Sequence, residues 1–284
     1  MGPSQFLIIS LTLTIFLTLT SSSDYTALVF KGCADKNFQD FNAPQRQTIK
    51  HLLGTLIAQS SAARFYNTTS DGAAAAAAVD GLFQCRGDLS NSDCEICVKK
   101  ASSMAQKLCK QAIAARIQLN GCYLGYEISG FRQAGRTEML YKVCGSSRVN
   151  NPGFGDMLDL ALGGIVKGLE SGNSAGFYAG GYQSVYVLGQ CEGDLSGGDC
   201  VECVKNAIDR AKSECGSSIS AQIYCQECYI SYTYYPNGVK SNQKSLSSSG
   251  YKQEHTKDSS YCDGRQGRSQ GGSRVVGRPP FPVR

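Results

Sequence analysis

Histidine is nearly absent from this sequence: among 284 residues it occurs only twice, at His51 and His255. Nucleophilic catalysis commonly needs such a base beside the nucleophile, so a centre of that kind is hard to build here. His51 lies beside an apolar stripe, where a structural role is favoured, and His255 falls in a polar C-terminal stretch. There is also no glycine-rich phosphate-binding loop. We therefore expect that the protein is not an enzyme and uses no cofactor or metal.

Long apolar runs are also missing, with one exception at the N-terminus. Residues 6–19 form an uncharged apolar segment that is followed by three serines. The pattern predicts a secretory signal peptide over residues 1–23, although no lysine or arginine precedes the segment. A membrane anchor is the alternative, but the segment is short, and nothing downstream approaches the roughly 20 apolar residues of a transmembrane helix. We expect a secreted chain without a membrane anchor, in an oxidising compartment.

A basic surface typical of nucleic-acid binding is missing as well, despite the formal net charge of +5. Most of this charge belongs to the tail after Cys262, where five arginines stand against one aspartate. The rest of the chain is close to neutral. We therefore expect no nucleic-acid partner, and a polar, basic tail over residues 243–284 that is rich in Gly, Ser and Pro.

Cysteine, in contrast, is abundant, and ten of the 14 cysteines form two sets with identical spacing. Each set reads C-x8-C-x2-C-x11-C-x12-C, and the second set follows the first by 106 residues. The first set is Cys85, Cys94, Cys97, Cys109 and Cys122, and the second is Cys191, Cys200, Cys203, Cys215 and Cys228. Such a repeat indicates one cysteine-rich domain of roughly 105 residues that has been duplicated.

The remaining cysteines complete the count. Cys33 and Cys144 give each unit six cysteines, and Cys225 and Cys262 are left over. An even total in a secreted chain favours seven disulfides, although six cysteines alone allow about 15 connectivities. Zinc binding by the C-x2-C pairs and a thioredoxin-like redox pair are the alternatives. Disulfides are favoured because only two histidines could supplement the thiolates of a zinc site.

Hydrophobic periodicity predicts two helices in each unit. The first helices carry the stripes Ile49, Leu52, Leu53, Leu56 and Ile57, and Leu158, Ala161, Leu162, Ile165 and Leu169. The second helices are expected to begin at capping boxes formed by Ser92 with Glu95 and by Asp199 with Glu202. Residues 114–128 and 220–235 alternate in polarity and are rich in Tyr and Ile, which predicts strands, and Asn120-Gly121 predicts a hairpin turn. Each unit is thus expected to be an α+β domain with two helices packed on a small antiparallel sheet.

Three local features complete the sequence-based predictions. Asn67 begins an N-glycosylation sequon in a polar stretch, which we expect to be a surface loop. The alanine run at 73–78 is interpreted as helix or strand filler before Val79. The linker between the units is expected near residues 130–137.

The cysteine pattern resembles that of the plant stress-antifungal domain, a cysteine-rich repeat homologous to ginkbilobin. Two such domains behind a signal peptide, without a kinase domain, resemble the cysteine-rich repeat secretory proteins and the plasmodesmata-located proteins. The resemblance covers residues 27 to about 235 and implies a five-stranded antiparallel sheet with two helices in each domain. We place the first domain at residues 24–132 and the second at 137–242.

The resemblance also implies how the cysteines pair. The family pattern gives Cys33–Cys109, Cys85–Cys94, Cys97–Cys122, Cys144–Cys215, Cys191–Cys200 and Cys203–Cys228. By elimination Cys225 would pair with Cys262, which is our own inference and not a family rule.

Ginkbilobin binds mannose through an Asn, an Arg and a Glu, and the resemblance places Arg116 and Glu127 at the last two positions. The Asn position is Ala34, which cannot supply an amide. We expect Arg116 and Glu127 to lie diagonally across the hairpin, with Gly125 leaving room between them. An ordinary cross-strand ion pair is the favoured interpretation, and a weak carbohydrate site is the alternative. In the second unit the three positions are Gly145, Gln222 and Thr233, so a site there is expected to be lost.

The end of the chain departs from the plasmodesmata-located proteins, which continue after the second domain into a transmembrane helix and a short cytosolic tail. This sequence instead ends in GRQGRSQGGSRVVGRPPFPVR. It is expected to be either a secreted paralogue or an isoform whose anchor is lost.

The resemblance implies a non-catalytic extracellular protein that regulates cell-to-cell trafficking and defence signalling at plasmodesmata or the cell surface. Its expected partners are other extracellular or receptor ectodomains, or further copies of itself. The alternative is a secreted antifungal lectin that binds mannose in cell-wall carbohydrate.

Overall fold

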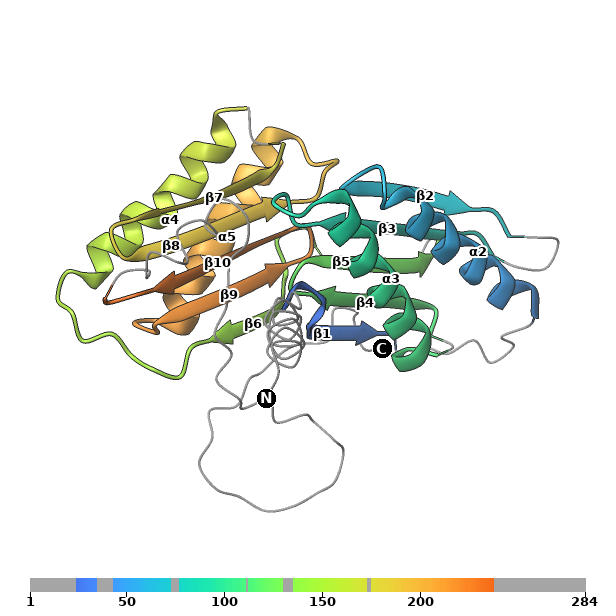
Figure 1. The fold of residues 1–284 in the computed structure, drawn as a ribbon, viewed down its shortest axis with the longest axis horizontal. Coiled ribbons are helices and arrows are strands. Elements are labelled where there is room, and N and C mark those ends of the chain that lie inside the picture. The colour runs from blue at the N-terminus through green and yellow to red at the C-terminus, as the bar shows by residue number, and fades with distance from the viewer. Residues whose placement is uncertain are drawn as a thin grey trace, which may run out of the picture.

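The computed structural model describes residues 24–34, 43–72, 77–110, 112–129, 135–172 and 175–237, which form two α+β units (Figure 1). The first unit contains a short 3-10 turn (Asp24–Thr26), β1 (Leu28–Cys33), α2 (Ala43–Gln59), β2 (Phe65–Ser70), β3 (Val79–Cys85), α3 (Asn91–Leu108), β4 (Ala114–Leu119) and β5 (Cys122–Ile128). The second contains β6 (Met139–Cys144), α4 (Phe154–Glu170), β7 (Phe177–Tyr182), β8 (Val185–Cys191), α5 (Gly197–Cys215), β9 (Ser220–Cys225) and β10 (Cys228–Tyr234). The predicted signal peptide, Cys262 and His255, the tail from residue 238, and residues 73–76 of the alanine run lie outside the described residues.

Each unit is built on one antiparallel sheet of five strands. The strand orders are β1-β4-β5-β3-β2 and β6-β9-β10-β8-β7, so the two sheets have the same topology. The predicted hairpin of β4 with β5 is present, and β9 with β10 forms a second one where only strand was predicted; each is closed by two residues. The prediction of two α+β domains, each with a five-stranded sheet and two helices, is therefore confirmed.

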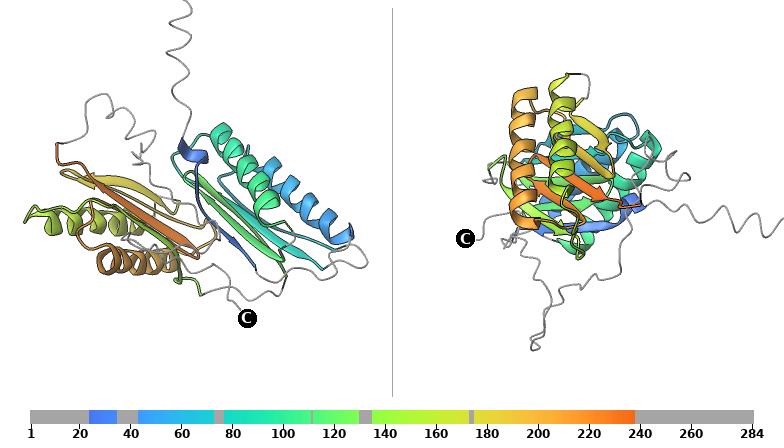
Figure 2. Two further views of the ribbon diagram at one scale, coloured as in Figure 1. Left: turned by 90° about the horizontal axis from the view of Figure 1, so that it is seen from below. Right: turned by 90° about the vertical axis from the view of Figure 1, so that its left-hand side faces the viewer.

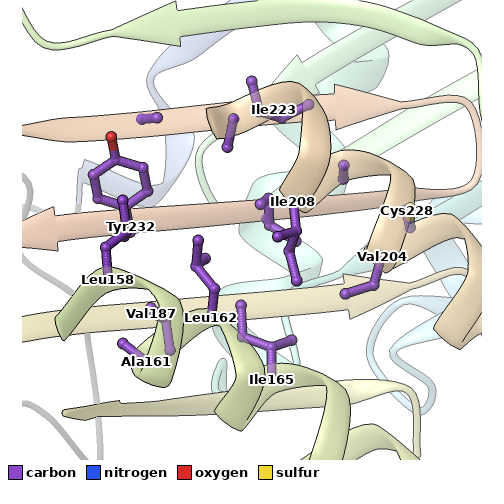
Figure 3. Close-up of a cluster of buried hydrophobic side chains, with 14 of the residues drawn as sticks. Leu158, Ala161, Leu162, Ile165, Val187, Val204, Ile208, Ile223, Cys228 and Tyr232 are labelled. Atoms are coloured by element: carbon purple, nitrogen blue, oxygen red, sulfur yellow. The ribbon is translucent and has the colours of Figure 1, made fainter. Parts of the chain in front are cut away.

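The two helices of each unit cover one face of its sheet, and the core lies between them. In the second unit, side chains of α4 and α5 such as Leu162, Ile165 and Val204 meet Val187 and Ile223 on the strands (Figure 3). The first unit repeats this packing, with Leu52, Leu53 and Leu56 of α2 almost fully buried. The helical stripes predicted from the sequence thus face the sheets, which is how an amphipathic helix contributes most of its stabilisation.

His51 differs from its prediction. Its neighbours Leu52 and Leu53 are buried, but His51 lies on the solvent side of α2 and is exposed. A residue one position away from an apolar stripe is rotated by about 100° on a helix, which is enough to leave the core.

Among the described residues, no helix has the length and apolar character that crossing a membrane requires.

The second helix of each unit starts earlier than the predicted capping boxes. The N-cap residues are Ser90 and Ser196, whose hydroxyls accept hydrogen bonds from the backbone N–H groups of Asp93 and Asp199 at 3.1 and 3.2 Å. Each serine also donates to the carboxylate of the same aspartate. Aspartate thus occupies the third helical position, where a Glu or Gln is the usual signature of a capping box, and its carboxylate accepts from the serine hydroxyl.

Replacing Ser90 with alanine is expected to lower the free energy of unfolding by about 1 kcal/mol, because a backbone donor at the start of α3 loses its partner. Ser92, which the sequence suggested as the cap, is the matched control, and Ser92→Ala should change stability by less than about 0.5 kcal/mol. Urea unfolding followed by circular dichroism measures both values. Equal losses for the two variants would contradict the assignment of the cap.

The two units pack against each other through contacts that occur twice, with the roles of the two units exchanged. Phe30 and Tyr141, each three residues before the first cysteine of its unit, stack on one another with ring centroids 5.0 Å apart. Phe177 of the second unit fills the space beside Gly87, where a Cβ would lie 2.4 Å from its ring. The equivalent residue of the first unit, Phe65, lies against Gly193 at 2.6 Å in the same way. This reciprocity indicates a pseudo-two-fold relation between the units.

The sheets lie towards the middle of the molecule and the helix pairs lie outside (Figure 2). Polar contacts across the boundary accompany the aromatic ones. Gln190 donates to the backbone oxygen of Cys85 at 2.9 Å, and the Gly87 N–H donates to Gln190 at 3.3 Å. Since these groups are buried or partly buried, their pairing removes the cost of leaving them unsatisfied.

Candidate functional site

A pocket of about 440 Å³ lies on the face of the first sheet that the helices leave open, at the boundary with the second unit. Strands β2 to β5 form its floor and one side, and Glu192 and Gln226 of the second unit reach it from across the boundary. Pockets that bind small ligands typically form at such domain junctions. Its lining residues are Asn67, Thr68, Thr69, Asp80, Gly81, Leu82, Ala115, Arg116, Tyr123, Gly125, Tyr126, Glu127, Glu192 and Gln226.

Strand register determines which side chains share this face. Arg116 lies opposite Gly125, and Glu127 lies opposite both Ala114 and Asp80. Arg116 and Glu127 are therefore diagonal neighbours, as the sequence suggested, and both line the pocket. The glycine between them leaves the floor open, because the nearest atom to an added Cβ would be a backbone oxygen 3.6 Å away.

Arg116 is buried, and its guanidinium is directed towards the second unit. Its Nη1 donates to the backbone oxygen of Gln226 at 2.7 Å, and its Cζ lies 4.0 Å from the ring centroid of Tyr123. Burial lowers the pKa of Arg116, whereas the acidic Glu192 and Glu227 raise it. Its Nε has no hydrogen-bond partner among the described residues. A buried donor without a partner is costly, so this atom is available to a ligand oxygen.

Glu192 faces Arg116 from the second unit, and sequence reasoning missed it. Only 8% of its surface is exposed, and the hydroxyl of Tyr123 donates a hydrogen bond to it. Burial raises the pKa of Glu192 to about 8, Arg116 opposes this effect, and Glu227 and Asp194 add to it. Burial thus favours the protonated form of this carboxyl. The sequence does contain one signal of this residue. The equivalent position in the first unit is Arg86, so the two otherwise similar segments carry opposite charge there.

Ala34 does not contribute to the pocket. It is buried at the end of the first edge strand, and its backbone N–H donates to the oxygen of Ala114 at 2.9 Å. The asparagine in the pocket is instead Asn67, whose Nδ2 donates to Asp194 of the second unit at 3.0 Å. The pocket thus holds one arginine, three carboxyl groups (Asp80, Glu127 and Glu192) and two side-chain amides (Asn67 and Gln226). Its asparagine comes from a different strand than the resemblance implied.

Asn67 also corrects a structural prediction, because the sequon lies in strand β2 and not in a loop. β2 is an edge strand with partly or fully exposed side chains, so it can carry the polar sequence FYNTTS without a local apolar signal. A glycan would replace one of the two hydrogens of Asn67 Nδ2, and the hydrogen bond to Asp194 uses one of them. Glycosylation of Asn67 stays a prediction.

The equivalent positions in the second unit do not form a matching site. Gln222 replaces the arginine, is buried, and accepts a hydrogen bond from the hydroxyl of Tyr224 at 2.6 Å. Gly145 replaces Ala34, and a Cβ there would lie 2.7 Å from Ser220 Oγ. Gln222 is thus occupied within the protein, and no side chain at Gly145 could reach a ligand.

Each unit contains three disulfides. These six bonds are the six pairs that the resemblance implied: Cys33–Cys109, Cys85–Cys94, Cys97–Cys122, Cys144–Cys215, Cys191–Cys200 and Cys203–Cys228. Cys225 is a buried thiol without a disulfide partner in the described part of the chain, and burial raises its pKa to about 11. Its predicted partner Cys262 is not described, so the seventh bond stays a prediction.

The zinc and redox alternatives find little support in this arrangement. The sulfurs of Cys203, Cys225 and Cys228 lie within 4.8 Å of one another, but two of them form a disulfide and only one is a thiol. Zinc needs several thiolate or imidazole ligands. Cys94 and Cys97 bond to Cys85 and Cys122 and not to each other, unlike a redox C-x2-C pair.

Comparison with known proteins adds the family. A model of the "Salt stress response/antifungal" family matches residues 32–129 and 143–235. Plasmodesmata-located protein 2 of Arabidopsis thaliana is 50% identical over 220 residues, which are 78% of this chain and 70% of that protein. Plasmodesmata-located protein 1 of the same plant is 45% identical over 253 residues, covering 85% and 82%. The crystal structure of the tandem DUF26 ectodomain of the cysteine-rich receptor-like protein PDLP8 from Arabidopsis thaliana matches with a TM-score of 0.65 and 29% identity, over 74% of this chain and 98% of that one.

Proposed function

The chain belongs to the family of plasmodesmata-located proteins and carries its tandem cysteine-rich ectodomain, and from this membership we propose that it is a non-catalytic recognition protein of the cell exterior. It regulates cell-to-cell trafficking and defence signalling through contacts of its two domains with other ectodomains. The observation that supports this most is that both disulfide-stapled units are intact and share a buried boundary. A broad surface formed by both units suits protein recognition better than a single deep pocket does.

The same proposal includes the route and place of the protein. Six disulfides form and persist in an oxidising compartment, which agrees with the predicted signal peptide over residues 1–23. The relatives at 50% and 45% identity are named for plasmodesmata. We therefore place the protein in the apoplast, concentrated at plasmodesmata.

A fluorescent fusion of the full chain, expressed in leaf epidermis, tests this location. We expect spots along the cell wall that coincide with a plasmodesmal callose stain. The matched control is the same fluorescent protein secreted behind residues 1–23 alone, which should spread evenly. A full-length fusion that is as even as this control would contradict the proposal.

Carbohydrate binding in the pocket is the second candidate function. Its support is the buried Arg116 with an unpartnered Nε beside Glu127 and the carboxyl of Glu192, which together can donate to and accept from sugar hydroxyls. We expect mannose or mannose-rich glycans to bind, and Arg116→Ala to abolish binding. Arg148→Ala is the matched control, because Arg148 also donates to a backbone oxygen but lies outside the pocket. Calorimetry that detects no binding at millimolar mannose would exclude this candidate.

A further inference from the structure

The helix layers of the two units carry opposite charge. In the first unit, helix α2 has no acidic residue, and the layer holds five basic residues against two acidic ones. The basic residues are Arg46, Lys50, Lys99, Lys100 and Lys107, and the acidic ones are Asp93 and Glu95. We call this surface the basic layer. Histidine is not counted in it.

In the second unit the balance is reversed. The layer formed by α4 and α5 holds seven acidic residues against four basic ones. The acidic residues are Asp156, Asp159, Glu170, Asp199, Glu202, Asp209 and Glu214, and the basic ones are Lys167, Lys205, Arg210 and Lys212. We call this surface the acidic layer.

Ion pairs within each layer do not cancel the difference. Lys99 pairs with Glu95 in the basic layer, but Lys50, Lys100 and Lys107 are exposed and take part in no ion pair among the described residues. In the acidic layer, four acidic residues pair with basic ones. The exposed Asp156, Glu202 and Asp209 have no such pair within the described chain. Lys167 of the acidic layer is likewise exposed without an ion pair among the described residues. The layers therefore present opposite net charge to the solvent, positive on the first unit and negative on the second.

Each layer also exposes one large aliphatic side chain beside this charge. Ile96 on α3 is 51% exposed, and Lys100 lies four residues later on the same side of the helix. Leu160 on α4 is 56% exposed, and Asp156 lies four residues before it. A shallow hollow lined by Asp156, Met157, Leu160 and Tyr182 adjoins this second pair. An apolar contact flanked by opposite charges is thus available, but only between two molecules.

The arrangement of the layers excludes their meeting within one chain. They lie on opposite outer sides of the molecule, with both sheets between them (Figure 2). We propose that the basic layer of one copy docks on the acidic layer of a second copy, with Ile96 and Lys100 against Leu160 and Asp156. A contact between unlike surfaces is heterologous, so it adds copies head to tail and does not stop at a dimer.

This contact deepens the proposed function by naming one partner of the ectodomain, a further copy of the same chain. It rests on the proposed function in one respect: if the protein is concentrated at plasmodesmata, its copies meet more often there. The contact itself is weak and depends on salt, since exposed charges are screened over about 8 Å at physiological ionic strength.

Sedimentation velocity of the purified full-length secreted chain tests the contact. We expect self-association in about 50 mM NaCl that weakens at least tenfold, in terms of Kd, in about 300 mM NaCl. Two variants remove one surface each: Ile96→Ser with Lys100→Gln, and Leu160→Ser with Asp156→Asn. Because all four residues are exposed, the fold should persist, and each variant alone should associate at least tenfold more weakly. Lys31→Gln, at an exposed position on β1, is the matched control and should behave like the natural chain.

Mixing the two variants gives the sharpest result. Each retains the surface that the other has lost, so an equimolar mixture should form a dimer that does not grow further. A natural chain that stays monomeric at low salt, variants that associate as well as it does, or a mixture that stays monomeric would overturn the proposal. None of these results bears on whether the protein reaches plasmodesmata, which the fluorescent fusion measures separately.

Discussion

Loss of the Cys33–Cys109 disulfide is expected to lower the free energy of unfolding by about 4 kcal/mol. The bond spans 76 positions and ties the edge strand β1 to the end of α3. Without it the unfolded chain regains the entropy of a long open loop, and β1 keeps only its ladder with β4 and the ring contacts of Phe30. A small domain has few other sources of stability, so a Cys33→Ser, Cys109→Ser variant is expected to be largely unfolded at about 37 °C.

The short loop within the same unit is the matched control. Cys85–Cys94 spans only nine positions, and its removal should cost about 2 kcal/mol less, because the entropy of loop closure grows with the logarithm of loop length. The second unit offers a repeat of the comparison with Cys144–Cys215 and Cys191–Cys200, at separations of 71 and nine. Urea unfolding of the four double variants gives the values. A larger loss from the short loops than from the long ones would contradict the entropic explanation.

Raising the pH from about 5 to about 8 is expected to destabilise the protein through Glu192. Burial raises the pKa of this carboxyl to about 8 in the folded protein, against about 4.3 in an unfolded chain. Between these two values the folded state holds a proton that the unfolded state has released. The free energy of unfolding therefore falls as pH rises, by at most about 1.4 kcal/mol per pH unit, and the loss is complete above the folded pKa.

Glu192→Gln separates this effect from other titrating groups. Glutamine cannot ionise but keeps an oxygen that accepts the hydrogen bond of Tyr123. Subtracting the stability of the variant from that of the natural chain at each pH removes the contributions they share, such as that of Glu214, whose pKa Lys142 lowers. We expect this difference to favour the variant increasingly towards pH 8. A difference that does not change with pH would show that Glu192 is ionised in the folded protein.

The helices and the hairpin of β4 with β5 could be predicted because their signals are local. The stripe from Leu158 to Leu169 and the turn at Asn120-Gly121 follow from the periodicity of one segment and the backbone preference of two residues. Strands β2 and β7 lack such a signal, since FYNTTS and FYAGGY are polar or glycine-rich edge strands. Local patterns predicted only the two strands of one hairpin in each unit, in residues 114–128 and 220–235, and the family resemblance alone implied a sheet of five.

Only the part of the pocket that belongs to the first unit could be predicted from the sequence. The family resemblance identified Arg116 and Glu127, and their diagonal placement could be predicted because both lie on one hairpin. Glu192 and Gln226 reach the same pocket from another domain, and no pattern within a segment reports how two domains pack. The sequon of Asn67 reports a possible glycan and gives no sign that its strand β2 lies beside the second unit.

The pseudo-two-fold boundary also bears on how the two halves diverged. Arg86 and Glu192 occupy equivalent positions, and each acts on a tyrosine of the opposite unit, Tyr229 and Tyr123 respectively. An assembly of two separate identical chains must carry the same residue at both positions, so it would bury either two arginines or two glutamates there. Covalent fusion removes that symmetry constraint. One end of the boundary could then evolve a basic group and the other an acidic one, which is how a duplicated scaffold can come to hold a single, asymmetric pocket.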